Sequence, residues 1–321
     1  MIQVLISLLI LISGFLFAQI EPVSDLHSNP SRVWALTNGM VHNEPGRFLK
    51  KATIILRDGK IMSLGRYIKI PEDAYEIDLE GAHVYAGFIE SWLEVKKTQK
   101  DKVAQEHWNG KIRSEYQVLD DFKPDDTLLK SLHALGFTNA HIVPESGVFR
   151  GQSALVSLEK SPVSFNASVS QVLNFEYSGW SGKEYPYSLL GAIALMRQTF
   201  YDAKWYEEAQ EKWNTYPEEN EPIKANLSLA SLAKSRQAKK PFTFMTRDEH
   251  YSLRALKILN EFNLNPWLLG NGFEYRRLKE ITEMKPFIIH PLDFPAQPKV
   301  LDPNRALQYS TEQLKHWDLA K

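Results

Sequence analysis

A carboxylate and a histidine at the ends of expected strands are the best candidates for chemistry in this chain. Glu94 follows an apolar strand expected at residues 83–89, and His290 is the last residue of another expected at 286–290. A carboxylate and an imidazole can transfer protons or ligate a metal ion. The competing interpretation of His290 is a hydrogen-bonded structural histidine, and that of Glu94 is an exposed loop carboxylate.

The other histidines have mainly structural interpretations. His250 stands in an acidic segment that favours a helix start, with a ligand role as the alternative. His141 lies within an expected strand, where a buried and hydrogen-bonded ring is typical. His316 and Asp318 are two positions apart on an expected helix, so their side chains do not face each other.

Two further groups of residues could bind a ligand. Residues 147–153 combine glycine, arginine and serine, which suits either an anion-binding loop or a simple turn. The aromatic residues Trp180, Trp205, Trp213 and Tyr185 could line a sugar or peptide groove, and core packing is the alternative.

Two kinds of segment must position these residues. Residues 32–85 alternate as short strands with a hairpin turn at Asp58-Gly59. After a polar, irregular insertion at 96–127, strands and helices alternate, which predicts a parallel α/β architecture. Helices are expected at 128–135, 186–213, 224–238, 249–262 and 273–283, and strands at 83–89, 136–144, 240–245, 265–269 and 286–290.

The composition excludes several classes of function. The chain has 321 residues and a formal net charge of -1, so no broad positive field favours nucleic acid or an anionic membrane. It contains no cysteine, which excludes disulfides and thiolate metal sites.

Residues 1–18 have the pattern of a secretory signal peptide. Positions 4–17 are almost entirely apolar, and Ala18 follows them. The apolar run is short for a membrane span, so we expect cleavage, export to the periplasm or cell exterior, and no stable membrane span afterwards. An uncleaved anchor or a buried helix is the alternative.

The first part of the chain also resembles the amidohydrolase superfamily, which comprises metal-dependent hydrolases built on a (β/α)8 barrel. The resemblance rests on the order and spacing of residues 53–61, 70–74, 77–81 and 87–89. Residues 87–94, Gly-Phe-Ile-Glu-Ser-Trp-Leu-Glu, are similar to the family's Gly-Phe-Ile-Asp-x-His-x-His. Residues 187–200 and 290–295 are similar to the imidazolonepropionase-like branch, particularly its secreted bacterial members.

This resemblance implies a fold and a reaction. The fold would be a small β-sandwich portion at residues 30–85, followed by an incomplete (β/α)8 TIM barrel at residues 86–321. About six strand–helix units are expected where a closed barrel has eight, which implies a truncated chain or a fragment. The family's reaction is hydrolysis of an amide or cyclic amide C–N bond by water on zinc or another divalent metal.

Carried over one position at a time, however, the family's metal ligands fall on unsuitable residues. The histidine pair of the first strand corresponds to Trp92 and Glu94, and later ligands to Met245, or Thr246, and Leu269. The bridging lysine or glutamate has no clear counterpart. We therefore predict no metal in this chain.

Three hypotheses follow from the resemblance. The chain is a non-catalytic homologue that binds a small amide or peptide-like ligand, or a subunit that pairs with an active relative. Alternatively, it is a hydrolase with an unusual site that uses Glu94 and His290.

Overall fold

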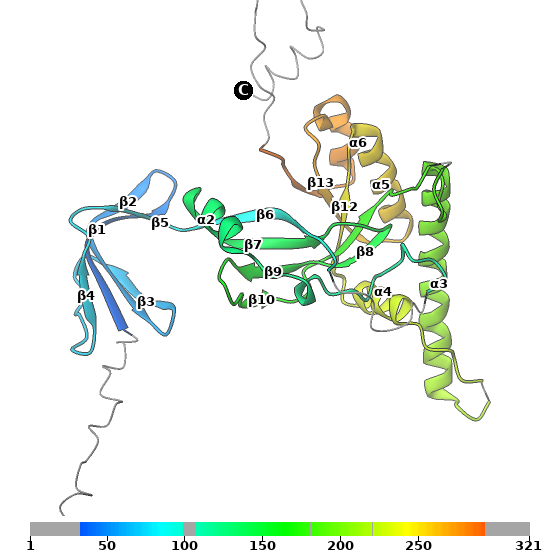
Figure 1. Ribbon diagram of the computed structural model, residues 1–321, viewed down its shortest axis with the longest axis horizontal. Helices are drawn as coiled ribbons and strands as arrows, with labels where there is room; N and C mark the ends of the chain where they lie inside the picture. Colours follow the sequence, from blue (N-terminus) through cyan, green and yellow to red (C-terminus); the bar gives the residue numbers. More distant parts are fainter. Residues whose placement is uncertain (1–32, 99–106, 180, 220, 293–321) are drawn as a thin grey trace, which may run out of the picture. The chain divides into compact units, whose positions relative to one another are not determined.

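The computed structural model describes residues 33–98, 107–179, 181–219 and 221–292 (Figure 1). The chain divides into two compact units between Ala86 and Gly87. The predicted signal peptide, Trp180 and the pair His316 and Asp318 lie outside the described residues. Within those residues, no helix has the length and apolar character needed to cross a membrane.

The first unit contains one mixed five-stranded sheet, drawn in blue in Figure 1. Its strands are β1 (Val33–Glu44), β2 (Arg47–Arg57), β3 (Lys60–Gly65), β4 (Tyr75–Asp78) and β5 (His83–Tyr85). β3, β2 and β1 are antiparallel neighbours, whereas β4 and β5 both pair in parallel with β1. The predicted hairpin turn is confirmed, because Asp58 and Gly59 have φ angles of 50° and 74°.

Two small apolar clusters stabilise this sheet. One contains Val33, Ala35 and Ile55, and the other contains Val41 and Ile54. The five strands of the first unit form a single sheet. The β-sandwich organisation of residues 30–85 stays a prediction.

The second unit begins with a four-stranded sheet in the order β10-β9-β7-β6. The strands are β6 (Phe88–Val95), β7 (Phe137–Pro144), β9 (Ala154–Ser157) and β10 (Ser164–Asn166). β6 and β7 are parallel and are connected through helix α2 (Asp126–Ala134). Asp125 begins this helix by accepting a hydrogen bond from the backbone N–H of Leu128.

A five-stranded sheet in the order β14-β13-β12-β11-β8 follows. It comprises β8 (Phe149–Gln152), β11 (Gln171–Asn174), β12 (Pro241–Met245), β13 (Asn265–Leu269) and β14 (Phe287–Ile289). Its four strands from β11 to β14 are parallel, and β8 is antiparallel to β11. The connecting helices are α3 (Leu189–Thr215), α4 (Leu227–Gln237), α5 (Glu249–Glu261), the short 3-10 helix η2 (Glu274–Arg277) and α6 (Leu278–Glu283).

The largest apolar core lies between this sheet and its helices. Phe242 and Phe244 are fully buried in it, together with Leu256 of α5 and Phe200 of α3. Since successive strand residues point to opposite faces, the β12 residues between and after the two phenylalanines face away from these helices. In every parallel strand of this sheet, side chains point alternately toward the helices and away from them.

Three expectations differ from the structure. The strand expected at 83–89 is two strands, β5 and β6, in different sheets, because the chain passes from one unit to the other between them. The insertion at 96–127 is irregular, but it is not merely a polar loop, since Ile112 and Val118 are buried. Residues 149–152, expected in a loop or turn, form β8, so antiparallel strands interrupt the predicted strand–helix alternation.

Candidate functional site

Four neighbouring parallel strands of the five-stranded sheet end side by side at their carboxyl termini. Asn174, Met245, Leu269 and Ile289 are the last residues of β11 to β14 and are paired in register. His290 follows this row directly and is exposed. The two positions that match family ligands in this sheet therefore do lie side by side, but with a thioether and an isobutyl group as side chains.

Trp92 and Glu94 lie near the end of β6 in the other sheet of this unit. Leu93 and Val95 pack with the core cluster that includes residues of α2. By strand alternation, Trp92 and Glu94 point to the opposite face. Glu94 is paired in register with Val143 of β7.

Glu94 forms an ion pair with Arg150 of β8. Arg150 Nη1 lies 3.1 Å from Glu94 Oε1, and the exposed fractions of the two side chains are 5% and 35%. Glu94 Oε1 also accepts a hydrogen bond from Trp92 Nε1 at 3.3 Å, and Arg150 Nη1 donates one to the Pro144 carbonyl oxygen at 3.3 Å. Arg150 Nε is buried and has no hydrogen-bond partner among the described residues. The pair thus holds a buried cation with a spare N–H donor.

His141 of β7 is the buried histidine of this region. Its Nδ1 lies 3.0 Å from the Ser91 carbonyl oxygen. Its ring packs edge to face with the Trp92 ring, with the ring centroids 6.3 Å apart. Since a carbonyl only accepts, Nδ1 carries the hydrogen, and Nε2 is the bare nitrogen of the neutral ring. Nε2 is buried without a partner among the described residues. Burial lowers the pKa of His141, so the ring is neutral at neutral pH.

The lowered pKa predicts how stability depends on pH. In the unfolded chain His141 binds a proton near pH 6.5, whereas the folded chain resists that proton. The unfolded state therefore gains protons first, and the free energy of unfolding falls as the pH drops below 6.5. We expect His141→Gln to lose less stability between about pH 7 and pH 5, measured by urea unfolding.

A matched variant makes this comparison specific. His290→Gln makes the same exchange at an exposed position and is the control for the effect of replacing a histidine by glutamine. Burial also lowers the pKa of His107, so part of the slope remains in His141→Gln. Equal slopes for wild type and His141→Gln would contradict the assignment.

A second ion pair lies beyond the end of β11. Lys111 Nζ is 2.6 Å from Glu176 Oε1, and the Gly147 backbone N–H donates to Glu176 Oε2 at 2.7 Å. Burial raises the pKa of Glu176, but these two bonds outweigh it and the pKa is lowered overall. The carboxylate is therefore ionised at neutral pH and holds the start of the 147–153 segment.

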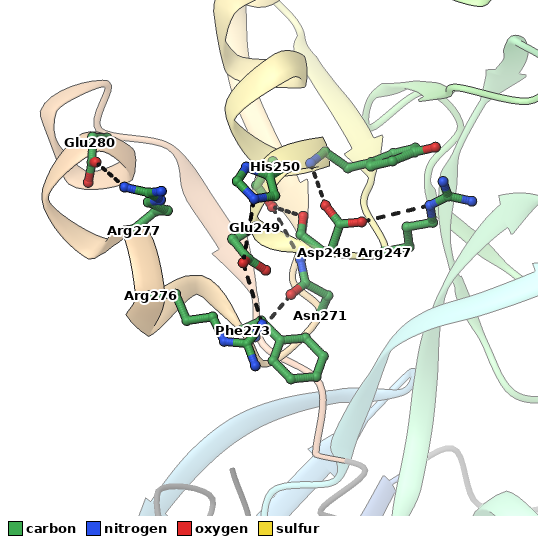
Figure 2. A network of polar contacts seen from close by, with 11 residues as sticks. Arg247, Asp248, Glu249, His250, Asn271, Phe273, Arg276, Arg277 and Glu280 are labelled. Carbon is green, nitrogen blue, oxygen red and sulfur yellow. Dashed lines mark hydrogen bonds and ion pairs between the residues drawn. The ribbon is translucent and has the colours of Figure 1, made fainter. Parts of the chain in front are cut away.

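The network in Figure 2 holds the loop after β13 against the start of α5. Arg276 Nη1 lies 3.4 Å from Glu249 Oε1, two residues that Figure 2 labels. Asn271 Nδ2 also donates a hydrogen bond to Thr246 Oγ1 at 3.1 Å. Asp248 begins α5 by accepting a bond from the Tyr251 backbone N–H at 2.8 Å. These contacts order the polar loops that follow β12 and β13.

The remaining sequence candidates are scattered. No hydrogen bond or ion pair joins Glu94 to His290 in the part of the chain that the structure describes. His250 is in the first turn of α5, with Nε2 3.9 Å from Glu249 Oε1. The rings of Tyr185 and Trp108 stack with their centroids 6.4 Å apart, and Trp205 is exposed on α3. Sequence reasoning did not predict the Glu94–Arg150 pair, because its residues belong to different sheets.

The donor set at the expected metal positions does not fit a catalytic zinc ion. Glu94 is the single carboxylate among Trp92, Glu94, Met245 and Leu269, and a guanidinium already lies 3.1 Å from it. A catalytic zinc site needs three protein ligands, commonly histidine with carboxylate. The described residues contain no group of three or more histidine and acidic side chains arranged to hold a metal.

Comparison with known proteins supports the fold. No protein-family model matches the chain, and no curated protein matches it. An amidohydrolase from Thermotoga maritima MSB8 superposes with a TM-score of 0.66 at 20% identity, covering 80% of this chain and 69% of that one. A guanine deaminase from C. acetobutylicum has a TM-score of 0.35 at 13% identity, covering 80% and 67%. The first likeness shows that this mixed α/β chain shares the fold of that solved structure over most of its length.

Proposed function

We propose that this chain binds a small amide or peptide-like ligand at the carboxyl ends of its parallel strands, without a catalytic metal ion. The ion pair between Arg150 and Glu94 is the observation that carries the proposal. It holds a buried positive charge beside the position where the resemblance expects a metal ligand. A guanidinium binds carbonyl and carboxylate oxygens through directed N–H donors. The Nε–H donor of Arg150 makes no hydrogen bond to any described residue.

The finer family assignment is part of this proposal. We infer a member of the imidazolonepropionase-like branch of the secreted type, with a partial (β/α)8 barrel after a β-sandwich portion. Six parallel strands support the barrel: β6 and β7 in one sheet, and β11 to β14 in the other. The signal-peptide pattern at residues 1–18 supports export.

A second candidate is hydrolysis of a C–N bond at the same place. His141 favours it, because its Nε2 is a bare, buried nitrogen near Trp92 on the face that carries Glu94. A neutral imidazole can accept a proton from an attacking water. The two candidates differ in whether the bound amide is cleaved.

Ligand binding in the presence of a chelator tests the proposal. We expect an N-acetyl amino acid, a dipeptide or a hydantoin to raise the unfolding midpoint of the wild-type chain in EDTA. Arg150→Met should weaken this binding by about tenfold or more, because it removes a charged hydrogen bond worth about 1.5–3 kcal/mol. Thermal unfolding across a ligand series measures the effect.

Arg197→Met is the matched control, because Arg197 of α3 pairs with Glu261, the last residue of α5, at the helix end that lies away from the carboxyl ends of the strands. It should leave ligand affinity unchanged. Hydrolysis is followed in the same samples by the release of free amine. Amide cleavage that requires zinc and stops in EDTA would overturn the proposal, as would equal affinity in wild type and Arg150→Met.

A further inference from the structure

Two histidines lie together on neighbouring strands of the first unit. His42 belongs to β1 and His83 begins β5, and these strands are parallel partners. His42 Nε2 lies 3.0 Å from His83 Nδ1, and both side chains are accessible to solvent. At this distance one ring nitrogen donates and the other accepts, so the two imidazoles share one hydrogen.

Aromatic neighbours hold the rings in place. The His42 ring stacks on the Tyr85 ring with centroids 4.3 Å apart and planes 14° apart. Phe48 contacts the same imidazole at 5.4 Å, and the Tyr85 hydroxyl lies 3.4 Å from His83 Nδ1. Since the rings are already ordered, a ligand that joins them needs little rearrangement.

The separation of the two nitrogens suits a shared metal ion. Imidazole nitrogens bind zinc at about 2.0–2.1 Å, which places two ligands about 3.3 Å apart in a tetrahedral site. In a square-planar site, two adjacent nitrogens at the same bond length are about 2.9 Å apart. The 3.0 Å between His42 Nε2 and His83 Nδ1 falls between these values.

We propose that His42 Nε2 and His83 Nδ1 bind one divalent transition-metal ion, which replaces the hydrogen they share. Both rings are then neutral, with their hydrogens on His42 Nδ1 and His83 Nε2. Imidazole ligands suit copper, nickel and zinc, whereas magnesium and calcium prefer oxygen. Water completes the coordination, so the affinity is expected to be about micromolar, with copper bound most tightly.

Calorimetric titration of the full chain without an affinity tag tests this site. Copper, nickel and zinc salts are the probes, at about pH 7.5, because protons compete with metal ions for imidazole at lower pH. We expect one ion per chain and no binding of magnesium. His42→Ala and His83→Ala should each weaken binding by about tenfold or more, and the double variant should abolish it.

The controls separate the two histidines from the rest of the chain. His290→Ala should bind like the wild type. Tyr85→Phe keeps the stacked ring and should bind normally, whereas Tyr85→Ala should weaken binding, because it releases the His42 ring. Circular dichroism checks that each variant is folded.

Two results would overturn the site. One is unchanged stoichiometry and affinity in the folded double variant. The other is no binding of any of the three ions by the wild type at about millimolar concentration. Neither result bears on the ligand proposed at Arg150, because that binding is measured with a chelator present.

Discussion

Glu94→Ala is expected to lower the free energy of unfolding by about 2–3 kcal/mol, because it leaves the Arg150 guanidinium buried without its carboxylate. The arginine side chain is only 5% exposed, so water replaces the lost carboxylate incompletely. The estimate is below the value for a fully buried pair, since Glu94 itself is 35% exposed. Urea unfolding followed by tryptophan fluorescence measures the difference.

Glu145→Ala is the matched control for this prediction. Glu145 follows β7 and lies 3.9 Å from Lys96, whose side chain is 80% exposed. Such an exposed pair contributes at most about 1 kcal/mol. Replacing both partners, as Glu94→Leu with Arg150→Met, should cost less than Glu94→Ala alone. Equal losses for Glu94→Ala and Glu145→Ala would show that the ion pair is unimportant for stability.

Gly151→Ala should destabilise the chain by about 3 kcal/mol or more, because two costs add. The backbone at Gly151 has a φ of +120°, which a residue with a Cβ atom rarely adopts. An added Cβ would also lie 2.6 Å from the Tyr116 carbonyl oxygen. That oxygen accepts a hydrogen bond from the Gln152 N–H at 2.8 Å, so it cannot move without breaking the contact.

Gly179→Ala separates the two costs. Gly179 has a φ of +72°, and an added Cβ there would meet no atom within 4 Å. Its replacement should therefore cost about 1 kcal/mol, from backbone strain alone. Chemical unfolding of both variants gives the comparison. A Gly151→Ala chain as stable as Gly179→Ala would mean that the segment around Tyr116 relaxes freely.

Local patterns in the sequence predicted most helices and parallel strands of the second unit. The apolar spacing of α5 and the short apolar runs of β12 and β13 are sufficient signals, because each buries one face or both faces in the same core. The four strands from β8 to β11 were missed. β8 contains Arg150 and Gly151, which do not favour a strand on their own, so partner strands determine its conformation.

The candidate site was predicted only in part. The resemblance to the amidohydrolase superfamily pointed to Glu94 in one sheet and to Met245 and Leu269 in the other, and the last two are paired in register at the ends of their strands. The partner of Glu94 lies 56 residues further along the chain, and no local pattern links the two. His141 Nε2, which has no hydrogen-bond partner among the described residues, could not be predicted either, since its surroundings depend on which atoms pack around the folded ring.

The buried guanidinium has a consequence for how this site keeps its charge. A metal ion is acquired from the surroundings and can be lost to a chelator or to competing proteins. Arginine remains protonated at every physiological pH, so the charge of Arg150 is encoded in the chain and is present as soon as it folds. Its effect on a ligand is then modulated by its ion-pair partner, Glu94, and is independent of metal supply.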